Sequence, residues 1–442
     1  MRHAQLARLG SEATAQLWSY AAVATVATVQ AKLRPLPSTP ANVKIGLLTT
    51  SFPRHAGDIA GDFVLGYARA LRDEGHYVEV LAPEPTEASQ PSAERGITLQ
   101  HVPYLRPAVL QRTFYGAGVP DNLRRNPLTA LGLAPFCGNL YLHARRSSRD
   151  WHALVSHWAL PCALIAGAVR DARPHIAVLH SADVHLLQQL PLRGPIAERI
   201  ARTATALWFV TQAQRDQFIA LLPPQTQPPR TLVCPMGIDV SETTPLSNAE
   251  REAFRRRHGL QGFCVLLLTR LVAIKGVDIA LRAAAIGGIT LLIAGDGPLR
   301  AELMQQARAL AVPVRWLGVV RGEEKRCWMS AADAFALPSR RLADGRSEGM
   351  PCALLEALAH GLPVVASRLD GIAEAFDENA PPHALVPPDD PAALHAALLR
   401  LHGSRAAGRD GSTHAAHYGW GRARDCIAEL LEPVAPTRSS CR

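Results

Sequence analysis

Short apolar runs alternate with longer stretches of helical periodicity along most of the chain. The first apolar run covers residues 43–48 and leads into a loop that carries glycines. A helical pattern then runs over residues 63–74, and a second apolar run covers residues 77–82. Strand, loop, helix and strand at this spacing predict a βαβ unit and a parallel sheet. The same pattern predicts further strands at residues 152–156, 176–180, 206–210, 263–269, 289–294, 332–338 and 363–367.

A proline-rich stretch over residues 222–229 divides these strands into two sets. Because 442 residues are enough for two domains of ordinary size, we predict two Rossmann-like α/β domains, over residues 43–225 and 226–418. An extension over residues 1–42 precedes them. Its apolar part, residues 17–29, is too short to span a bilayer. We expect it to be dispensable or to touch a membrane as an amphipathic helix, rather than to direct export.

Basic residues outnumber acidic ones, and the formal net charge is +9. Only four lysines occur, so the excess of positive charge comes almost entirely from arginine. This charge is typical either of a solvated surface or of a surface that binds an anionic ligand or a membrane. Aromatic residues are 5% of the chain and no long basic run occurs, which argues against nucleic-acid binding. The eight cysteines form no C-x-x-C pair and no Cys/His cluster with metal spacing. We therefore expect reduced thiols in the cytosol and no metal site.

The most informative segment holds two carboxylates eight residues apart. Glu348 precedes a predicted helix in which Pro351 takes the first position, where a missing N–H costs nothing, and Glu356 lies inside that helix. Gly349 allows a ligand to approach the backbone closely. Free N–H groups and the positive end of the helix dipole face whatever binds there. The two carboxylates are thus placed to hold two parts of one elongated ligand.

Two cations follow the strand predicted over residues 263–269. Arg270 and Lys275 lie where the carboxyl end of a parallel strand opens toward a ligand, and their charge suits a diphosphate. The alternative is that both are exposed loop residues. The next strand ends in a turn with Gly295 and Gly297, which are either ligand contacts or plain turn residues. Arg300 replaces the third glycine of a dinucleotide fingerprint, which argues against NAD binding.

Histidines end two successive strands of the first half, His157 and His180. A lone histidine is usually structural, but two at neighbouring strand ends indicate a ligand site.

Residues 102–149 hold seven arginines and a single acid, Asp121, among apolar and aromatic residues such as Leu105, Phe114 and Tyr115. This stretch is either a solvated basic face or a surface that binds an acceptor or phospholipid.

The segment over residues 347–366 resembles the E-x7-E signature of the family 4 retaining glycosyltransferases. These enzymes adopt the GT-B fold, in which two Rossmann-like domains face each other across a cleft. Further motifs agree in order along the chain, at Gly57 and Gly61, 180–183, 235–239, Arg270, 275–276, 295–298, 370–374 and 386–390. The chain departs from the family at residues 56–57 and 370–371, where paired glycines are common. The resemblance implies that a C-terminal helix, within residues 419–442, crosses back to the first domain.

The resemblance also implies a role for each matching residue. Glu356 would bind the ribose of a nucleotide sugar, Glu348 the donor sugar, and the two cations the diphosphate. The implied catalytic residues are Glu348, Arg270, Lys275 and His180. The implied donor-binding residues are Glu356, Gly349, Met350, Gly295 and Gly297. The loop with Gly57, Asp58 and Gly61 would lie near the diphosphate and the acceptor, and no metal or other cofactor is implied.

These expectations describe a metal-independent hexosyltransferase that moves a sugar from a UDP- or GDP-sugar to a hydroxyl acceptor. The expected setting is cell-surface polysaccharide or glycolipid biosynthesis in the cytoplasm. The acceptor would be a sugar or a lipid-linked sugar, and the first domain would dock peripherally on the anionic inner face of the membrane. The alternatives are a catalytically silent nucleotide-sugar-binding protein, a GT-B sugar-nucleotide epimerase, and a phosphorylase, which would need a lysine for pyridoxal phosphate.

Overall fold

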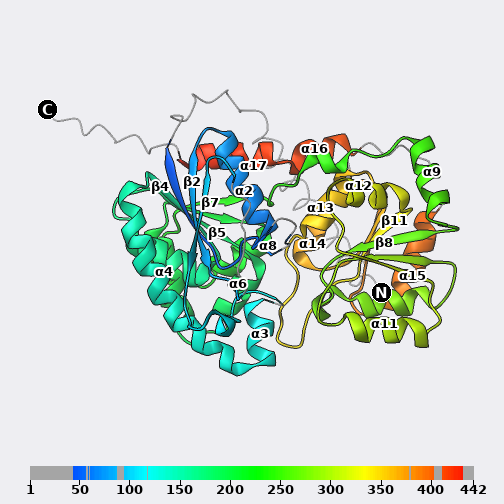
Figure 1. The fold of residues 1–442 in the computed structure, drawn as a ribbon, viewed down its shortest axis with the longest axis horizontal. Coiled ribbons are helices and arrows are strands. Elements are labelled where there is room, and N and C mark those ends of the chain that lie inside the picture. The colour runs from blue at the N-terminus through cyan, green and yellow to red at the C-terminus, as the bar shows by residue number, and fades with distance from the viewer. Residues whose placement is uncertain are drawn as a thin grey trace, which may run out of the picture. The chain divides into compact units, whose positions relative to one another are not determined.

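The computed structural model describes residues 43–55, 58, 60–86, 94–116, 118–377, 380–402 and 411–431. The predicted extension over residues 1–42 lies outside them, as does Gly57. Within the described residues the chain forms two parallel sheets, one in each half of the sequence (Figure 1). Parallel strands are joined by helical crossovers, which agrees with the predicted βαβ pattern.

The first sheet has seven strands in the order β3-β2-β1-β4-β5-β6-β7. They are β1 (Lys44–Leu48), β2 (Tyr77–Pro83), β3 (Ile97–Val102), β4 (Ala153–His157), β5 (His175–Leu179), β6 (Ala206–Phe209) and β7 (Arg230–Val233). Strands β4, β5 and β6 are buried along their whole length, as parallel strands covered by helices on both faces are. Because β7 still pairs with β6, the first sheet continues beyond residue 225.

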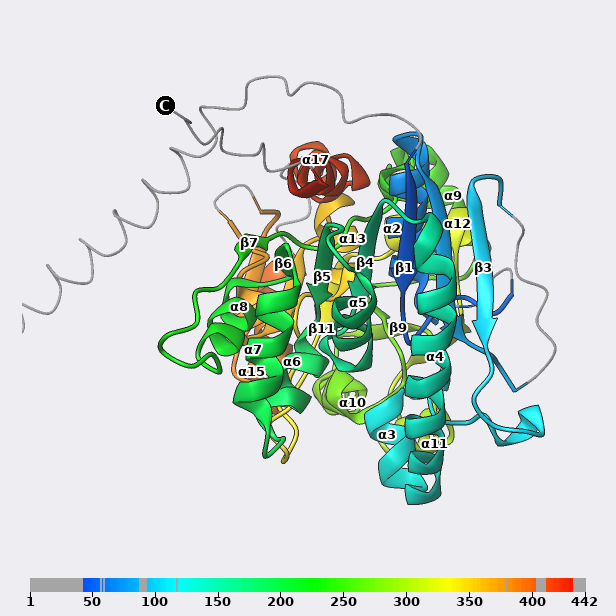
Figure 2. The same cartoon turned by 90° about the vertical axis from the view of Figure 1, so that its left-hand side faces the viewer.

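The helices of this half include α2, which begins directly after Gly61. The φ of Gly61 is 68°, and an added Cβ would lie 2.4 Å from the carbonyl oxygen of Ser51, so only glycine fits. Helix α2 covers Asp62–Asp73. The other helices of this half are α3 (Val119–Arg125), α4 (Leu133–Ser147), α5 (Leu164–Val169), α6 (Ser181–Gln188), α7 (Arg193–Thr203) and α8 (Gln212–Ile219). Two short helical turns, η1 (Ala108–Leu110) and η2 (Pro127–Gly132), flank α3, which lies beside one end of α4 (Figure 2).

The second sheet has six strands in the order β10-β9-β8-β11-β12-β13. They are β8 (Cys264–Leu268), β9 (Thr290–Ala294), β10 (Val314–Gly318), β11 (Ala334–Leu337), β12 (Val364–Ser367) and β13 (His383–Val386). The helices of this half are α9 (Asn248–Arg257), α10 (Val277–Ala284), α11 (Arg300–Ala309), α12 (Gly322–Ala331), α13 (Cys352–Ala359), α14 (Asp370–Ala373), α15 (Pro391–His402), α16 (Ser412–Tyr418) and α17 (Trp420–Leu431). This half also contains two short helical turns, η5 (Val240–Thr243) and η6 (Ala273–Lys275).

The last helix, α17, packs on α2 of the first half (Figure 1). Ile427 and Leu430 are buried in the same apolar core as β1 and β2. At Gly66 in α2, an added Cβ would lie 2.3 Å from the ring of Trp420, so the glycine permits this close approach. Arg424 also forms an ion pair with Glu74, at 3.2 Å. In the part of the chain that the structure describes, no helix has both the length and the apolar character that crossing a bilayer requires.

Candidate functional site

The E-x7-E segment begins in the loop after β11 and continues into α13. Helix α13 begins at Cys352, so Pro351 precedes the helix, with an extended ψ of 133°, instead of taking its first position as predicted. Glu348 therefore lies in the loop and Glu356 lies one turn into α13. No described residue accepts a hydrogen bond from the backbone N–H groups of Gly349, Met350, Cys352 and Ala353. These donors, at the positive end of α13, remain available to an anion.

Two predicted site residues, Lys275 and Glu348, are in direct contact. The Nζ atom of Lys275 lies 2.8 Å from Oε2 of Glu348, and both side chains are largely buried. Lys275 ends η6, and Gly276 follows it with a φ of 63°. An added Cβ at Gly276 would lie 1.9 Å from the carbonyl oxygen of Pro338. This glycine therefore lets η6 lie against the end of β11 and brings Lys275 to Glu348.

Arg270 is exposed and lies two residues beyond β8. Close packing of the backbone explains why glycine occupies positions 295 and 297. An added Cβ would lie 1.8 Å from the carbonyl oxygen of Thr269 at Gly295, and 2.6 Å from that of Leu271 at Gly297. Both glycines therefore let the loops after β8 and β9 touch. The roles of these three residues in donor binding stay predictions.

Glu356 is bound by a residue that the motifs did not single out, Lys325 of α12. The Nζ atom of Lys325 donates to Oε1 of Glu356 at 3.0 Å and lies 2.5 Å from a carboxylate oxygen of Glu242 in η5. Burial raises the pKa of Glu356, and the Lys325 ammonium opposes that rise. The only signal for Lys325 in the sequence is the rarity of lysine in this chain.

His180 directly precedes α6 as its N-cap residue, and its backbone N–H donates to the Asp183 carboxylate at 2.8 Å. Its Nε2 lies 3.2 Å from Nδ1 of His157, and its ring packs against Phe63 and Trp158. Burial lowers the pKa of His180 to about 3 and holds the pKa of His157 well below its usual value. Both rings are therefore neutral at physiological pH, so His180 can offer a hydrogen bond but no charge.

Asp58 shapes the loop that follows β1. It is buried, and its carboxylate accepts hydrogen bonds from the backbone N–H of Arg54 at 3.0 Å, from the Arg54 guanidinium at 2.5 Å, and from the backbone N–H of Ala60 at 3.1 Å. Burial would raise the pKa of Asp58, but the hydrogen bonds from Arg54 outweigh it and lower the pKa. Asp58 thus organises the loop from within, and the contact of this loop with a ligand stays a prediction.

The loop over residues 338–351 touches helix α6 of the first half. An added Cβ at Gly349 would lie 2.8 Å from Oγ of Ser181, the residue after His180. At Gly371 an added Cβ would lie 2.6 Å from the carbonyl oxygen of Gly349. The chain thus keeps a glycine at 371, where two segments of backbone meet, even though Asp370 replaces the other glycine common in the family.

Ion pairs tie the same loop to α3, which lies next to it in Figure 1. The Arg346 guanidinium, on a buried residue, lies 2.6 Å from the Asp121 carboxylate. Arg124 pairs with Asp344, whose carbonyl oxygen also accepts a hydrogen bond from the Gln189 side chain at 3.0 Å. Asp121, the single acid of the basic stretch, lies 3.9 Å from Arg124 of its own helix. Its closer partner, Arg346, is more than two hundred residues away, which no local pattern could indicate.

The basic stretch differs from expectation in its apolar residues. Phe114 is buried in an aromatic cluster, and the Tyr115 hydroxyl donates to the carbonyl oxygen of Pro83 at 2.8 Å. Neither is available to a membrane, because both complete the fold of the first half. Among the described residues of this stretch, the large apolar side chains that are exposed are Val109, Leu110, Leu128, Leu131 and Leu142.

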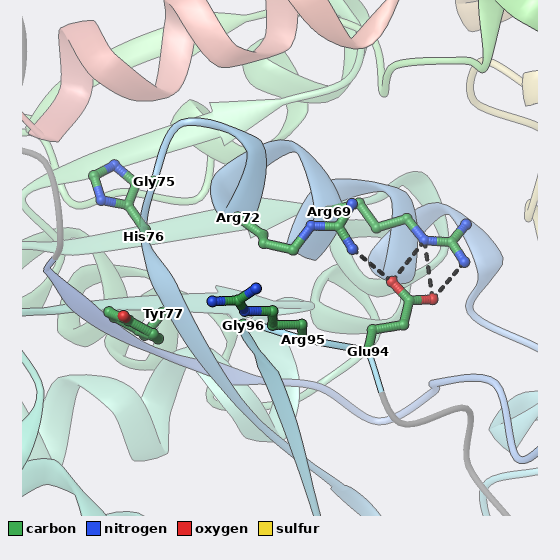
Figure 3. A pocket seen from close by; sticks show the side chains of 8 residues that line it. All are labelled: Arg69, Arg72, Gly75, His76, Tyr77, Glu94, Arg95 and Gly96. Carbon is green, nitrogen blue, oxygen red and sulfur yellow. Dashed lines mark hydrogen bonds and ion pairs between the residues drawn. The ribbon is translucent and has the colours of Figure 1, made fainter.

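A cavity of about 760 Å³ lies away from these residues, where β2 and β3 begin (Figure 3). Three arginines line it, but the Glu94 carboxylate already binds two of them, Arg69 at 2.5 Å and Arg72 at 2.9 Å. The loop after β1 leaves the opposite, carboxyl edge of the parallel sheet, so the cavity is no part of the predicted site. Within the described ranges, no three His, Cys, Asp or Glu residues are grouped so that they could hold a metal ion.

Comparison with known proteins places both halves in one family. Residues 60–237 match the model of the glycosyl transferase 4-like domain, and residues 262–404 match the model of glycosyl transferases group 1. Over 237 residues the chain is 32% identical to the amylovoran biosynthesis glycosyltransferase AmsK of Erwinia amylovora, covering 51% of this chain and 54% of that protein. It is also 32% identical to the GDP-mannose-dependent α-(1-6)-phosphatidylinositol monomannoside mannosyltransferase of Mycolicibacterium smegmatis, covering 50% and 61%. The match thus spans about half to three-fifths of the length of these relatives.

The fold is shared with solved glycosyltransferase structures. The structure is similar to that of Anabaena Alr3699/HepE in complex with UDP, with a TM-score of 0.63 and 18% identity over 88% of this chain and 99% of the other. At this identity the likeness concerns the fold alone. Three findings agree: the chain forms two parallel Rossmann-like sheets, it matches two family models in the expected order, and it shares its architecture with a solved glycosyltransferase structure. The chain therefore belongs to the group 1 glycosyl transferases and has the GT-B fold.

Proposed function

We propose that this protein is a retaining glycosyltransferase that moves a sugar from a nucleoside-diphosphate sugar to a hydroxyl acceptor without a metal ion. One observation carries the proposal: the ion pair of Lys275 and Glu348 lies at the start of a helix whose first N–H groups have no acceptor among the described residues. A cation and free N–H groups suit a diphosphate. Carboxylates at Glu348 and Glu356 suit the hydroxyls on either side of that diphosphate.

The reaction follows from this division of roles. Glu356 binds the ribose hydroxyls, and Glu348 binds hydroxyls of the donor sugar. As the bond between sugar and diphosphate breaks, negative charge builds on the diphosphate, and Lys275, Arg270 and the N–H groups of α13 stabilise it. The acceptor oxygen bonds to the sugar on the face that the diphosphate leaves, and the acceptor proton passes to a diphosphate oxygen. The configuration of the sugar is therefore retained, and the neutral His180 supplies a hydrogen bond at the reacting face.

The named relatives support the substrate class. One uses GDP-mannose and acts on a phosphatidylinositol mannoside, another belongs to amylovoran biosynthesis, and the HepE structure holds UDP. For this chain we accordingly propose a UDP- or GDP-sugar as donor, and a sugar or lipid-linked sugar of a surface polysaccharide or glycolipid as acceptor. The reaction would take place in the cytoplasm, at the inner face of the membrane.

We further propose that the first domain docks on anionic lipid through a small surface, the docking tip, defined as Val109, Leu110, Arg112, Arg125, Leu128 and Leu131. All six residues are exposed. Three hydrogen bonds from the Asn122 side chain hold residues 112–115 against α3. Neither arginine forms an ion pair with a described carboxylate, so both charges are available to lipid phosphates. Four exposed apolar side chains next to two arginines are suited to shallow insertion.

The test incubates purified protein, with and without EDTA, with radiolabelled UDP- and GDP-sugars and a membrane extract. Glu348→Gln, which removes a charge and keeps the shape, is the matched control. Transfer of label to an extract component by the wild type, in EDTA, is expected. Conversion of the donor sugar without an acceptor would indicate an epimerase, and donor binding without any product would indicate a silent binding protein. Strict dependence on a divalent ion would contradict the metal-free mechanism.

A further inference from the structure

We infer that Lys325 is a positioning residue for the donor nucleotide: it holds Glu356 by one oxygen and leaves the other oxygen for a hydroxyl of the ligand. The inference rests on the proposed function, in which Glu356 binds the ribose. It extends that function to α12, an element outside the E-x7-E segment.

The contact geometry is specific. Lys325 Nζ donates to Oε1 of Glu356 at 3.0 Å, and the two side chains are only 14% and 16% exposed. Among the residues that the structure describes, none donates a hydrogen bond to Oε2 of Glu356. A carboxylate with one oxygen engaged and one open is oriented before the ligand arrives, so less rotamer freedom is lost on binding.

Glu242 completes the arrangement from the other side. Its carboxylate lies 2.5 Å from Lys325 Nζ, so the ammonium is held between two carboxylates that come from η5 and α13. Glu242 follows the 235–239 segment that joins the two sheets. This anchor fixes the long lysine side chain, which would otherwise have many rotamers, in the one that reaches Glu356.

The charges around Glu356 explain why it needs this lysine. Burial raises the pKa of Glu356, and the carboxylates of Glu242 and of Asp62 at the start of α2 raise it further. Lys325 is the cation that lowers it. Without Lys325, Glu356 would take up a proton at higher pH, and a protonated Glu356 is a weaker acceptor for a ribose hydroxyl than a carboxylate.

The test measures the affinity of UDP and of GDP by calorimetry between about pH 6 and pH 9. The variants are Lys325→Met, Lys325→Arg and Glu356→Gln, and the double variant Lys325→Met with Glu356→Gln. The affinity of each variant is divided by the affinity of the wild type at the same pH, which cancels the effect of the nucleotide's own titration. Lys325→Met is expected to weaken nucleotide binding about tenfold or more near pH 6.5, as the loss of a charge-assisted hydrogen bond does. This loss of affinity is expected to shrink as pH rises. Lys325→Arg should restore most of the affinity.

Lys325 is expected to act through Glu356, so Lys325→Met should add nothing in the Glu356→Gln background. A deficit that does not change with pH, or a full additional loss in that background, overturns the inference while leaving the proposed function intact. If Lys325→Met fails to fold, wild-type affinity in Lys325→Gln overturns it equally. A wild type that binds neither nucleotide overturns the proposed function and this inference together.

Discussion

Lys275 and Glu348 form an ion pair, with Nζ 2.8 Å from Oε2, that joins two residues proposed to hold different parts of one ligand. The lysine is expected to face the diphosphate and the glutamate the sugar. Because both side chains are largely buried, each holds the other in place before the donor binds. Removal of one therefore also perturbs the other, and single variants have to be compared with the double variant.

We predict that Lys275→Met lowers kcat more than it weakens donor binding. The charge on the diphosphate grows as the sugar leaves, so an ammonium beside it stabilises the transition state more than the bound donor. An effect of about 2–4 kcal/mol on the barrier, or about 30- to 1,000-fold in kcat, is typical for a lost electrostatic donor. Steady-state kinetics together with calorimetric affinity for the donor measure the two effects separately. Arg270→Met should behave in the same way, and equal losses in kcat and affinity would contradict the assigned role.

The strands that periodicity predicted are the interior strands of both sheets. The four that it missed, β3, β7, β10 and β13, are the four edge strands. An edge strand has one neighbour and is partly open to solvent, and most positions in these four are half-buried or exposed. Polar residues therefore interrupt their apolar runs, and the signal of a fully buried strand is lost. The predicted domain limit at residue 225 falls before β7 for the same reason.

The site residues also fall into two groups, those that sequence motifs predict and those that only the structure reveals. Glu348, Lys275 and Glu356 were predicted because they belong to short motifs at strand ends and helix starts. The partner of Glu356, Lys325, and the residue that anchors this lysine, Glu242, come from elements that are distant in sequence and carry no motif, so only the tertiary structure identifies them. The same holds for Arg346 with Asp121, whose pairing depends on helix α3 and the loop over residues 338–351 meeting in space.

We predict that Gly371→Ala reduces donor affinity more than Gly349→Ala. The new Cβ at 371 would lie 2.6 Å from the carbonyl oxygen of Gly349, so the loop next to Glu348 must shift. At 349 the new Cβ would mainly meet the Ser181 side chain. Gly138→Ala in α4 is the control, because nothing lies within 4 Å of its new Cβ, and it should raise stability by up to about 1 kcal/mol. Calorimetry and thermal unfolding test all three, and equal affinities for the 349 and 371 variants would contradict the argument.

We predict that His175 makes the protein less stable in mild acid. This fully buried ring lies 2.8 Å from the Ser156 hydroxyl, and burial lowers its pKa to about 4. Because the folded pKa lies below the unfolded value of about 6.5, the unfolded chain binds a proton that the folded chain does not, and stability falls as pH falls through this window. Between pH 7 and pH 5 this group alone lowers the free energy of unfolding by up to about 2 kcal/mol.

The matched variant for this prediction is His175→Gln, which keeps a hydrogen-bonding group for Ser156 but does not titrate. Urea unfolding at pH 7 and pH 5 should show a smaller loss of stability in the variant than in the wild type. His157 and His180 respond to acid in the same direction, but they are unchanged in both proteins and cancel in the comparison. An identical loss in variant and wild type would show that His175 is not a source of acid sensitivity.

The last prediction concerns the docking tip. Each arginine near an anionic bilayer contributes about 1 kcal/mol, or about fivefold in affinity, and the exposed leucines add apolar contact. Wild-type protein should therefore sediment with phosphatidylglycerol vesicles at low salt, less at high salt, and little with neutral phosphatidylcholine vesicles. The double variant Arg112→Glu with Arg125→Glu should lose most of this binding, and Leu128→Ser with Leu131→Ser should lose a smaller part that does not depend on salt. Arg256→Glu with Arg257→Glu in α9 makes the same change in net charge on two exposed residues of the second half, so it is the control. If the α9 variant loses as much binding as the tip variant, attraction to the membrane follows the net charge of the protein, and the tip is only a solvated basic surface.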